Sequence, residues 1–582
     1  MIAGAARDAR DVRFPALAAF VLLAAGSIEA GKVAVHKYFS IDELMHAHAS
    51  WLTGRGSLPY RDFCDFHFPF LYQLLGVLWA GMDDDPRNVL FLRLAMLGLV
   101  FVIALAAAVV NRRDGLVAAL AAPAILLTLT PFVVRATEIR HDTLAFACFL
   151  SGLAVLSLDR PAARARGAIG GVLLALAVWS SQKAMLYGLP VGALLVAETA
   201  RRRDGPSTFG SAGAAWCGGG VVGFLAALYL TVTGSWRAFL TFCFGWALRW
   251  QAEYPGFSFL RALSPAEDRY VVVCLLAAAG LAGSLVAWRR RGGAISDPVV
   301  LPAACLASSL AYYVSLKAPY DYNLIPFLGF VAVFAGRGVG MLEAAAGSAA
   351  ARRGGSPAAA RAASTLAVVV ALIAPALALR RVDLFARQSN ALQLDVLAQV
   401  AALTSPADPA YDNSGSYVAR PSASFYFYTD APMRARLGDM LAQRIPDDIV
   451  RSGTVLFFRD ARTGSLPASL QAFLAEHFKP WSGDLWLWGR GYRADGAGSV
   501  ASTFEAVRKG RYFVEPASVL DGATLTVDGR RVEGAVFELE PGTHAIALEG
   551  APATEFHILW LPRDGRTWAP DFRSKPRFSR IL

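Results

Sequence analysis

Long apolar segments separated by short polar ones fill the first two-thirds of the chain. A helix that crosses a bilayer needs about 20 apolar residues. The apolar segments that approach this length are residues 14–35, 89–110, 115–134, 142–158, 167–182, 184–200, 209–233, 269–288, 297–316, 322–343 and 363–380. The pattern therefore predicts a polytopic α-helical membrane protein with about eleven spans.

Basic residues fall in every second loop between these segments. The arginines concerned are Arg112, Arg113, Arg160, Arg164, Arg166, Arg201–Arg203, Arg289–Arg291, Arg352, Arg353 and Arg361. Because positive loops stay cytoplasmic, the intervening loops and the region after residue 381 are expected outside. Counting the apolar segment Phe68–Met82 as a span would break this alternation, so it is expected to be a helix on the outer membrane surface.

The pattern changes at Val382 to that of a folded extracytoplasmic region. Residues 382–498 mix helical periodicity, as in Ala391–Ala402 and Met433–Arg444, with short strand-like runs such as Thr454–Phe458 and Leu485–Trp488. These residues are expected to form a mixed α/β domain, and residues 1–381 the membrane domain, with a first outer loop at 36–88 and its interfacial helix at 68–82.

Residues 499–582 predict a small β-sandwich-like domain with a basic tail. The run TLTVDGRRV places Asp528–Gly529 between alternating residues, which is a strong hairpin signal. EPGTHAIAL then supplies a further turn and strand. Two roles stay open for this domain: binding a glycan or guiding an acceptor, and stabilisation without any ligand.

The composition agrees with a membrane protein and argues against several kinds of binding site. The chain is 55% hydrophobic, with a net charge of +11. Residues 1–381 hold 34 basic and 22 acidic side chains, so the excess belongs to membrane topology rather than to nucleic-acid binding. The six cysteines are scattered without a CxxC pair, which argues against a disulfide framework or a zinc site. No nucleotide-binding or HExxH motif stands in a suitable context.

Residues 40–72, which follow the first apolar run, contain many polar side chains, although a short loop could connect the two neighbouring spans. Asp42 and Glu43 are adjacent carboxylates that suit a general base or a metal ligand. Ser40 and Glu43 also match a helix capping box, and the two interpretations are compatible. Further along, Arg61, Asp65 and His67 suit either a phosphate or sugar pocket or a polar interfacial loop.

Three other outer positions carry ionisable residues. The second outer loop contains Arg135, Glu138, Arg140, His141 and Asp142. Such a group is costly beside hydrocarbon unless it lines a wet cavity, although Asp142 also suits a helix cap. Lys183 and the cluster Lys317, Tyr320, Asp321 and Tyr322 stand at the outer ends of apolar runs. The lysines fit either snorkelling or binding of an anionic lipid headgroup.

The run DELMHAHASWLTGRGSLPYRDFCDFHFP, residues 42–69, resembles the first outer loop of GT-C glycosyltransferases. The likeness is to the bacterial branch near the aminoarabinose transferases and protein O-mannosyltransferases, and it covers residues 14–345. It implies transfer of a sugar from a polyprenyl-phosphate carrier to an acceptor at the outer membrane face. No cofactor is certain, a divalent metal stays open, and the donor substrate would be a polyprenyl-phosphate-linked sugar.

The resemblance also implies roles for individual residues. Asp42 takes the position of the acid that deprotonates the acceptor hydroxyl, and Lys183 and Lys317 take those of residues that hold the lipid phosphate. His67 departs from the family, because the aminoarabinose transferases have a lysine there. Glu138 or Asp142 is a candidate second carboxylate.

The expected function is therefore an inverting glycosyltransferase of the bacterial inner membrane, with its C-terminal region in the periplasm. Asp42 would act as the base, while Lys183, Lys317 and Arg140 offset the charge of the leaving phosphate. The acceptor would be a cell-envelope glycan, a lipid or a protein, and no nucleic acid is expected to bind. Two alternatives remain: a lipid-linked glycan transporter, for which no clear inverted repeat is visible, and a glycan polymerase or ligase, which would favour a large central outer loop.

Overall fold

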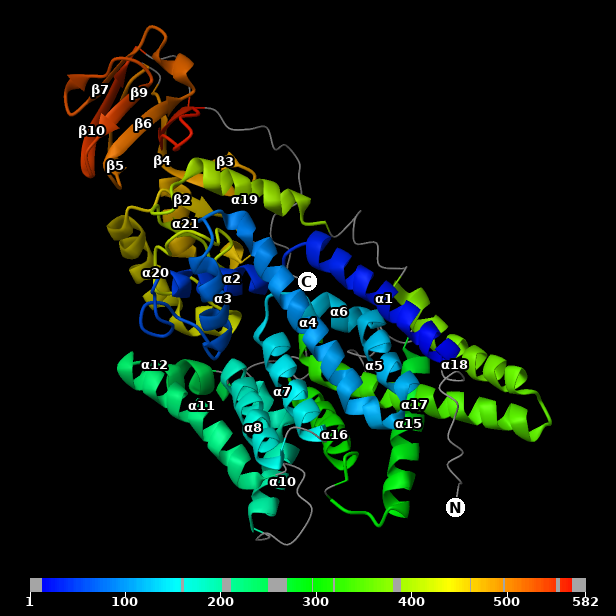
Figure 1. Cartoon of the computed structure of the whole chain (residues 1–582). Helices are drawn as coiled ribbons and strands as arrows, with labels where there is room; N and C mark the ends of the chain where they lie inside the picture. The colour runs from blue at the N-terminus through cyan, green and yellow to red at the C-terminus, as the bar shows by residue number, and fades with distance from the viewer. Residues whose placement is uncertain are drawn as a thin grey trace. The chain divides into compact units, whose positions relative to one another are not determined.

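The computed structural model describes residues 13–158, 162–200, 211–246, 248–249, 270–295, 297–317, 320–379, 389–460, 462–495, 498–550 and 555–567 (Figure 1). Its contacts divide the chain into two compact units. The first unit comprises Met1–Lys37, Phe66–Leu71 and Leu90–Ser389. The second comprises Tyr38–Asp65, Tyr72–Val89 and Asn390–Leu582. Most of the first outer loop is therefore grouped with the C-terminal part of the chain.

The described part of the first unit is built from helices, as its long apolar runs predict (Figure 1). Its main helices are α1 (Arg13–His36), α4 (Val89–Asn111), α5 (Leu116–Thr128), α6 (Thr130–Ala136), α7 (His141–Ser157), α8 (Ala163–Ser180), α9 (Lys183–Tyr187), α10 (Leu189–Ala200), α11 (Ala212–Val232), α12 (Trp236–Leu240), α15 (Val271–Arg290), α16 (Val300–Ser315), α17 (Ile325–Arg352) and α18 (Pro357–Leu379). Large apolar side chains such as Leu105, Phe224 and Leu366 are exposed on these helices. Exposed apolar faces of this extent suit contact with lipid.

The prediction of a polytopic membrane protein is confirmed, whereas the count of about eleven spans is not. Among the described residues, six helices are long and apolar enough to cross a bilayer, or seven if the pair α5–α6, bent by 73°, forms one span. Two helices are shorter than the spans predicted for them, since α10 and α16 have 12 and 16 residues, and α7 with its 17 residues is as short as its predicted span. The predicted span 184–200 is divided because α9 ends before Gly188 and α10 begins after it.

Small residues allow the apolar helices to pack closely. A Cβ atom on Gly280 of α15 would lie 1.9 Å from the carbonyl oxygen of Phe334 in α17. A Cβ atom on Gly338 of α17 would lie 2.2 Å from the carbonyl oxygen of Leu276 in α15. Glycines at both contact points are thus what lets these two backbones touch, as is common between membrane helices.

The second unit contains five principal helices. They are α2 (Ile41–Gly54), α3 (Phe70–Ala80, whose first two residues are grouped with the first unit), α19 (Ala391–Leu403), α20 (Ala431–Ser452) and α21 (Ala468–His477). The helix expected at Phe68–Met82 is therefore confirmed as α3, while its location on the membrane surface stays a prediction. The helical periodicity read at Ala391–Ala402 and Met433–Arg444 is likewise confirmed as α19 and α20.

Two β-sheets complete the second unit. The larger runs β1 (Ala410–Tyr411), β2 (Leu456–Phe458), β4 (Leu485–Arg493), β11 (Glu555–Trp560), β6 (Gly510–Glu515) and β9 (Val536–Leu539), with β3 (Phe478–Ser482) also paired to β4. The smaller runs β5 (Val500–Ala506), β10 (Gly542–Glu549), β7 (Thr524–Val527) and β8 (Arg530–Arg531). The predicted boundary between residues 498 and 499 falls between β4 and β5, and the larger sheet takes strands from both sides of it.

An aromatic pair connects the two sheets. The rings of Phe504 in β5 and Tyr512 in β6 meet edge to face, with centroids 5.3 Å apart. The predicted hairpin is confirmed, because Asp528 and Gly529 adopt φ angles of 52° and 75° between β7 and β8. The basic tail expected after residue 567 lies outside the described residues.

A glycine in the second unit yields a prediction about stability. Gly415 has a φ of +71°, and a Cβ atom there would lie 2.9 Å from both Cβ and Cδ2 of His48. Gly415→Ala is expected to destabilise the protein by about 1–3 kcal/mol, because it adds backbone strain and a steric clash. The free energy of unfolding in detergent micelles measures this effect. Gly464→Ala is the control, since no atom lies within 4 Å of its Cβ position, and equal losses in the two variants would contradict the prediction.

Candidate functional site

A buried carboxylate surrounded by three cations occupies the turn between α6 and α7. Glu138 is fully buried and forms ion pairs with Lys37, Arg135 and Arg140. Burial on its own raises the pKa of the Glu138 carboxyl, but the three cations together hold that pKa well below its usual value. Lys37 is also fixed through its backbone, because its carbonyl accepts a hydrogen bond from Arg93 of α4. Glu138 thus acts as a charged anchor that fixes the positions of the cations around it.

Several residues from distant parts of the first unit gather around Tyr322. The Arg140 guanidinium carbon lies 4.1 Å from the centroid of the Tyr322 ring, and the Lys183 ammonium nitrogen lies 4.6 Å from it. Tyr320 stacks on Tyr322 with centroids 5.4 Å apart. Lys183, at the start of α9, also forms an ion pair of 3.0 Å with Asp142 in the first turn of α7. We call Arg140, Asp142, Lys183, Tyr320 and Tyr322 the Tyr322 cluster.

The electrostatic balance of this region is positive. Around the Glu138 anchor and the Tyr322 cluster, the four cations Lys37, Arg135, Arg140 and Lys183 face three carboxylates: the buried or nearly buried Glu138 and Asp142, and the exposed Asp321, which pairs with Arg135. Lys183 keeps 24% of its side chain exposed, whereas the side chain of Arg140 is 5% exposed. The cluster can therefore offer an anion a planar guanidinium and an accessible ammonium group together.

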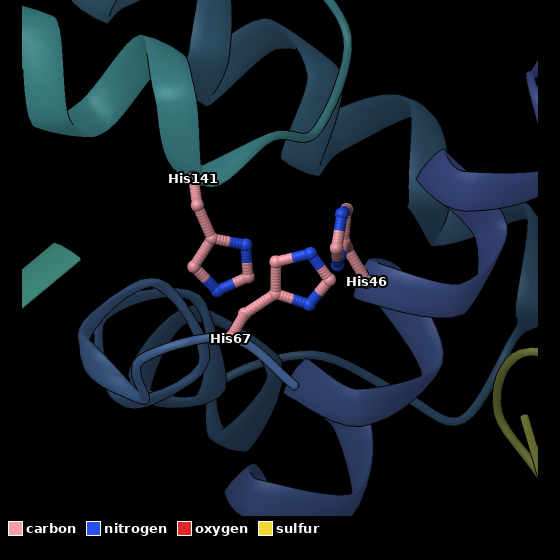
Figure 2. Close-up of side chains that lie close together, drawn as sticks. All are labelled: His46, His67 and His141. Carbon is pink, nitrogen blue, oxygen red and sulfur yellow. The ribbon is translucent and has the colours of Figure 1, made fainter. Parts of the chain in front are cut away.

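His67 lies in the short segment of the first outer loop that belongs to the first unit. Its ring stacks on that of His141, with centroids 4.7 Å apart and an interplanar angle of 11° (Figure 2). The amide of Gln182 donates a hydrogen bond to the carbonyl of Phe66 next to it. The predicted site residue Lys317 is exposed, two residues beyond the end of α16.

In the second unit, the paired carboxylates at the start of α2 have different surroundings. Ser40 caps α2 and forms a capping box with Glu43, whose side chain is fully buried. The capping interpretation is thus confirmed for Glu43. Asp42 is 26% exposed, and its Oδ1 accepts a hydrogen bond of 3.3 Å from Nη2 of Arg462. Asp42 is therefore the better candidate for a group that meets a substrate.

Asp65 and Arg61 of this loop have partners within the second unit. The Tyr72 hydroxyl donates a 2.7 Å hydrogen bond to Asp65 and lies 3.1 Å from Nδ1 of His46. His46, whose side chain is drawn in Figure 2, follows Asp42 by four residues, about one turn of α2. Arg61 is exposed and directs two nitrogens of its guanidinium to Asp62, each at 2.9 Å.

The sequence interpretation missed two residues of these clusters. Lys37 ends the first apolar run, where a lysine is typical of an interfacial anchor, and its pairing with Glu138 spans 101 residues. Arg462 lies in a region without motifs, 420 residues from Asp42. Only the position of Lys37 at the end of an apolar run offered a signal. Nothing in the sequence around Arg462 distinguishes it from other surface arginines.

The donor set around Asp42 does not suit a divalent metal ion. A guanidinium already binds one carboxylate oxygen of Asp42, and a second cation beside it would be repelled. No chemical step is therefore assigned to a metal at Asp42.

Comparison with known proteins indicates the fold. No protein-family model matches the sequence, and no curated protein matches it either. The structure resembles ArnT from Cupriavidus metallidurans bound to undecaprenyl phosphate, with a TM-score of 0.51 and 14% identity over 77% of this chain and 94% of that chain. It also resembles the apo oligosaccharyltransferase of Archaeoglobus fulgidus, with a TM-score of 0.50 and 12% identity over 80% of this chain and 73% of that chain. The chain thus has the fold of the GT-C membrane glycosyltransferases, which its first outer loop resembles in sequence.

Proposed function

We propose that the protein is an inverting glycosyltransferase that moves a sugar from a polyprenyl-phosphate carrier to an acceptor at the periplasmic face of the bacterial inner membrane. The observation that carries this proposal is the Tyr322 cluster, in which Arg140 and Lys183 share one aromatic ring. The GT-C fold supports the class of reaction, and the undecaprenyl phosphate bound to ArnT supports the class of lipid.

The Tyr322 cluster suits the phosphate of the donor and of the departing carrier. Arginine binds phosphate oxygens through a planar fork, and lysine adds a mobile point charge. Arg140 forms an ion pair with Glu138, and its guanidinium also lies over the Tyr322 ring. Preorganised cations of this kind stabilise the negative charge that develops on a leaving phosphate. We assign phosphate binding to Arg140 and Lys183, with Tyr320 and Tyr322 as their aromatic support.

Asp42 suits the acceptor half of the reaction. The carboxylate would take the proton of the acceptor hydroxyl as that oxygen forms its bond to the anomeric carbon. The bond between the anomeric carbon and the phosphate oxygen breaks at the same time, and polyprenyl phosphate leaves as the anion. Direct displacement through an oxocarbenium-like state inverts the configuration of the sugar. Glu43 supports this role through its part in the capping box that begins α2.

One observation bears on the transporter alternative. Transporters place substrates at broken helices that recur in two related halves of the chain. The bend of 73° between α5 and α6 is such a break, and it is the one bent pair that meets the span test among the described residues. Gly188 separates α9 from α10 as well, and the choice of the transferase rests on the Tyr322 cluster and on the fold.

Binding of the carrier lipid tests the assignment of the phosphate site. Undecaprenyl phosphate is expected to raise the thermal unfolding temperature of the purified protein, whereas undecaprenol, which lacks the phosphate, is not. Lys183→Gln is expected to weaken binding about tenfold or more, because it removes a charge-assisted contact and leaves Asp142 without its 3.0 Å partner.

The control for this experiment is Lys32→Gln, which removes an exposed lysine of the same unit that pairs with Glu29. Its affinity for undecaprenyl phosphate should equal that of the wild type. Equal stabilisation by undecaprenol, or unchanged affinity in Lys183→Gln, would contradict the assignment.

A further inference from the structure

Arg462 reaches the candidate base from the C-terminal part of the second unit. Its Nη2 atom donates to Oδ1 of Asp42 at 3.3 Å, and 14% of its side chain is exposed. The two residues are 420 positions apart in the sequence. The start of α2 is therefore joined to the turn that precedes α21 by a charged, largely buried contact.

An aromatic ring supports the guanidinium of Arg462. Its central carbon lies 4.8 Å from the centroid of the Tyr428 ring. Stacking on a ring restricts the plane of a guanidinium, which a lysine at the same place would not reproduce. The negative charges of Asp42 and Asp460 and the positive charge of Arg434 act on Arg462, and those of Asp42, Asp430 and Asp65 act on Tyr428.

The backbone that carries Arg462 is also fixed. Asp460 accepts hydrogen bonds from the backbone amides of Arg462 at 2.9 Å and Thr463 at 2.8 Å, and from the Thr463 hydroxyl at 3.0 Å. The other oxygen of Asp460 accepts a 2.7 Å hydrogen bond from the Ser414 hydroxyl. Because Asp460 binds the backbone amides of Arg462 and Thr463, the position of the Arg462 Cα atom is fixed.

The turn at Ser414 extends this network to a second buried carboxyl. The Ser414 hydroxyl lies 3.1 Å from Oδ2 of Asp412 as well as 2.7 Å from Asp460. Burial and the charge of Asp460 raise the pKa of Asp412 to about 7, although the backbone amides of Ser414, Gly415 and Ser416 donate to its carboxyl and lower that pKa.

We propose that Arg462 is a positioning residue for glycosyl transfer, holding the Asp42 carboxylate in one orientation and in its charged form. This inference rests on the proposed role of Asp42 as the base. A nearby cation favours the ionised carboxylate, and a fixed carboxylate loses less freedom when the acceptor hydroxyl approaches. The C-terminal part of the chain thereby contributes directly to the transfer reaction, beyond any role in binding an acceptor.

Kinetics of Arg462 variants test the proposal. The substrate is an undecaprenyl-phosphate-linked pentose or hexose that the wild type consumes, and release of undecaprenyl phosphate is the readout. Arg462→Met is expected to lower kcat about 10- to 100-fold with little change in the KM of the donor. The acidic limb of its pH–rate profile is expected to move up by about one pH unit. Arg462→Lys, which restores the charge without the planar fork, should recover part of kcat and of the pH shift.

A neighbouring arginine provides the matched control. Arg459 is exposed and stacks on Trp486, with its guanidinium carbon 5.2 Å from the ring centroid. Arg459→Met should leave both kcat and the pH profile unchanged. If Arg462→Met does not fold, Tyr428→Leu tests the same idea, because it removes the stacking partner and no formal charge. That variant is expected to lower kcat severalfold and to move the acidic limb in the same direction.

The outcomes separate this inference from the proposed function. Wild-type kcat and pH profile in folded Arg462→Met, or in Tyr428→Leu where Arg462→Met is unfolded, would overturn the positioning role. If Asp42→Asn is inactive while Arg462→Met is normal, only the positioning role fails. If Asp42→Asn is fully active, the proposed base fails, and the role of Arg462 fails with it.

Discussion

Asp42→Asn is expected to lower the rate of glycosyl transfer about 100- to 10,000-fold. The asparagine amide keeps the shape of the carboxylate but cannot take the proton of the acceptor hydroxyl. Asp42 stands in the first turn of a capped helix, partly exposed and in contact with Arg462, so the substitution should leave the local fold intact. The measurement is release of undecaprenyl phosphate from a lipid-linked sugar in the presence of an acceptor.

Glu43→Gln is the matched control for this variant. Glutamine can fill the same position of a capping box, so this change removes the adjacent negative charge while keeping the helix start. Its rate is expected to stay within a few-fold of the wild type, and both variants should unfold near the wild-type temperature. A wild-type rate of glycosyl transfer in folded Asp42→Asn would contradict the assignment of Asp42 as the general base.

Glu138→Gln is expected to cost about 3–5 kcal/mol of stability, the largest such effect among the changes considered. The substitution leaves Lys37, Arg135 and Arg140 close together around a neutral amide. Charges buried without a partner are far more costly than the pair itself is favourable. Denaturant unfolding of the variant in detergent micelles measures the loss.

The dependence on pH provides a second test of the Glu138 anchor. The folded state holds the pKa of Glu138 below its usual value, so the stabilisation is complete above that usual value. This stabilisation is lost as the pH falls towards the lowered pKa of the folded state. In Glu138→Gln, the free energy of unfolding should therefore fall less steeply as the pH is lowered.

Asp321→Asn is the control for Glu138→Gln, because Asp321 pairs with Arg135 at 3.4 Å but is 63% exposed. A pair of this kind contributes about 0–1 kcal/mol. Equal losses in the two variants would show that Glu138 is no anchor.

Much of the fold could be predicted because membrane helices and hairpins leave local signals. Apolar runs located the helices of the first unit, and Asp528–Gly529 located the hairpin between β7 and β8. The number of spans was not predictable from hydropathy, since α7 and α16 are too short and α5–α6 is bent. Hydropathy averages over a window and does not register where a helix ends or turns.

Some residues of the candidate site could be predicted from local sequence features, whereas contacts between residues far apart in the sequence could not. Ionisable residues at the ends of apolar runs are conspicuous, and this drew attention to Arg140, Lys183 and Tyr322, which the fold brings together. The capping box of α2 was also readable, because it lies within four residues. The contact of Arg462 with Asp42 could not be predicted, because the sequence around an arginine in a turn does not indicate a partner 420 residues away.

The most direct test of glycosyl transfer is to incubate the purified protein in liposomes with undecaprenyl-phosphate-linked pentoses and hexoses and a cell-envelope extract as acceptor. Mass spectrometry then follows the lipid. The expected result is conversion of one donor into undecaprenyl phosphate and a glycosylated acceptor of inverted configuration, with the rate of conversion by Asp42→Asn lowered about 100-fold or more. Movement of the intact donor across the bilayer without cleavage would contradict the account and indicate a transporter.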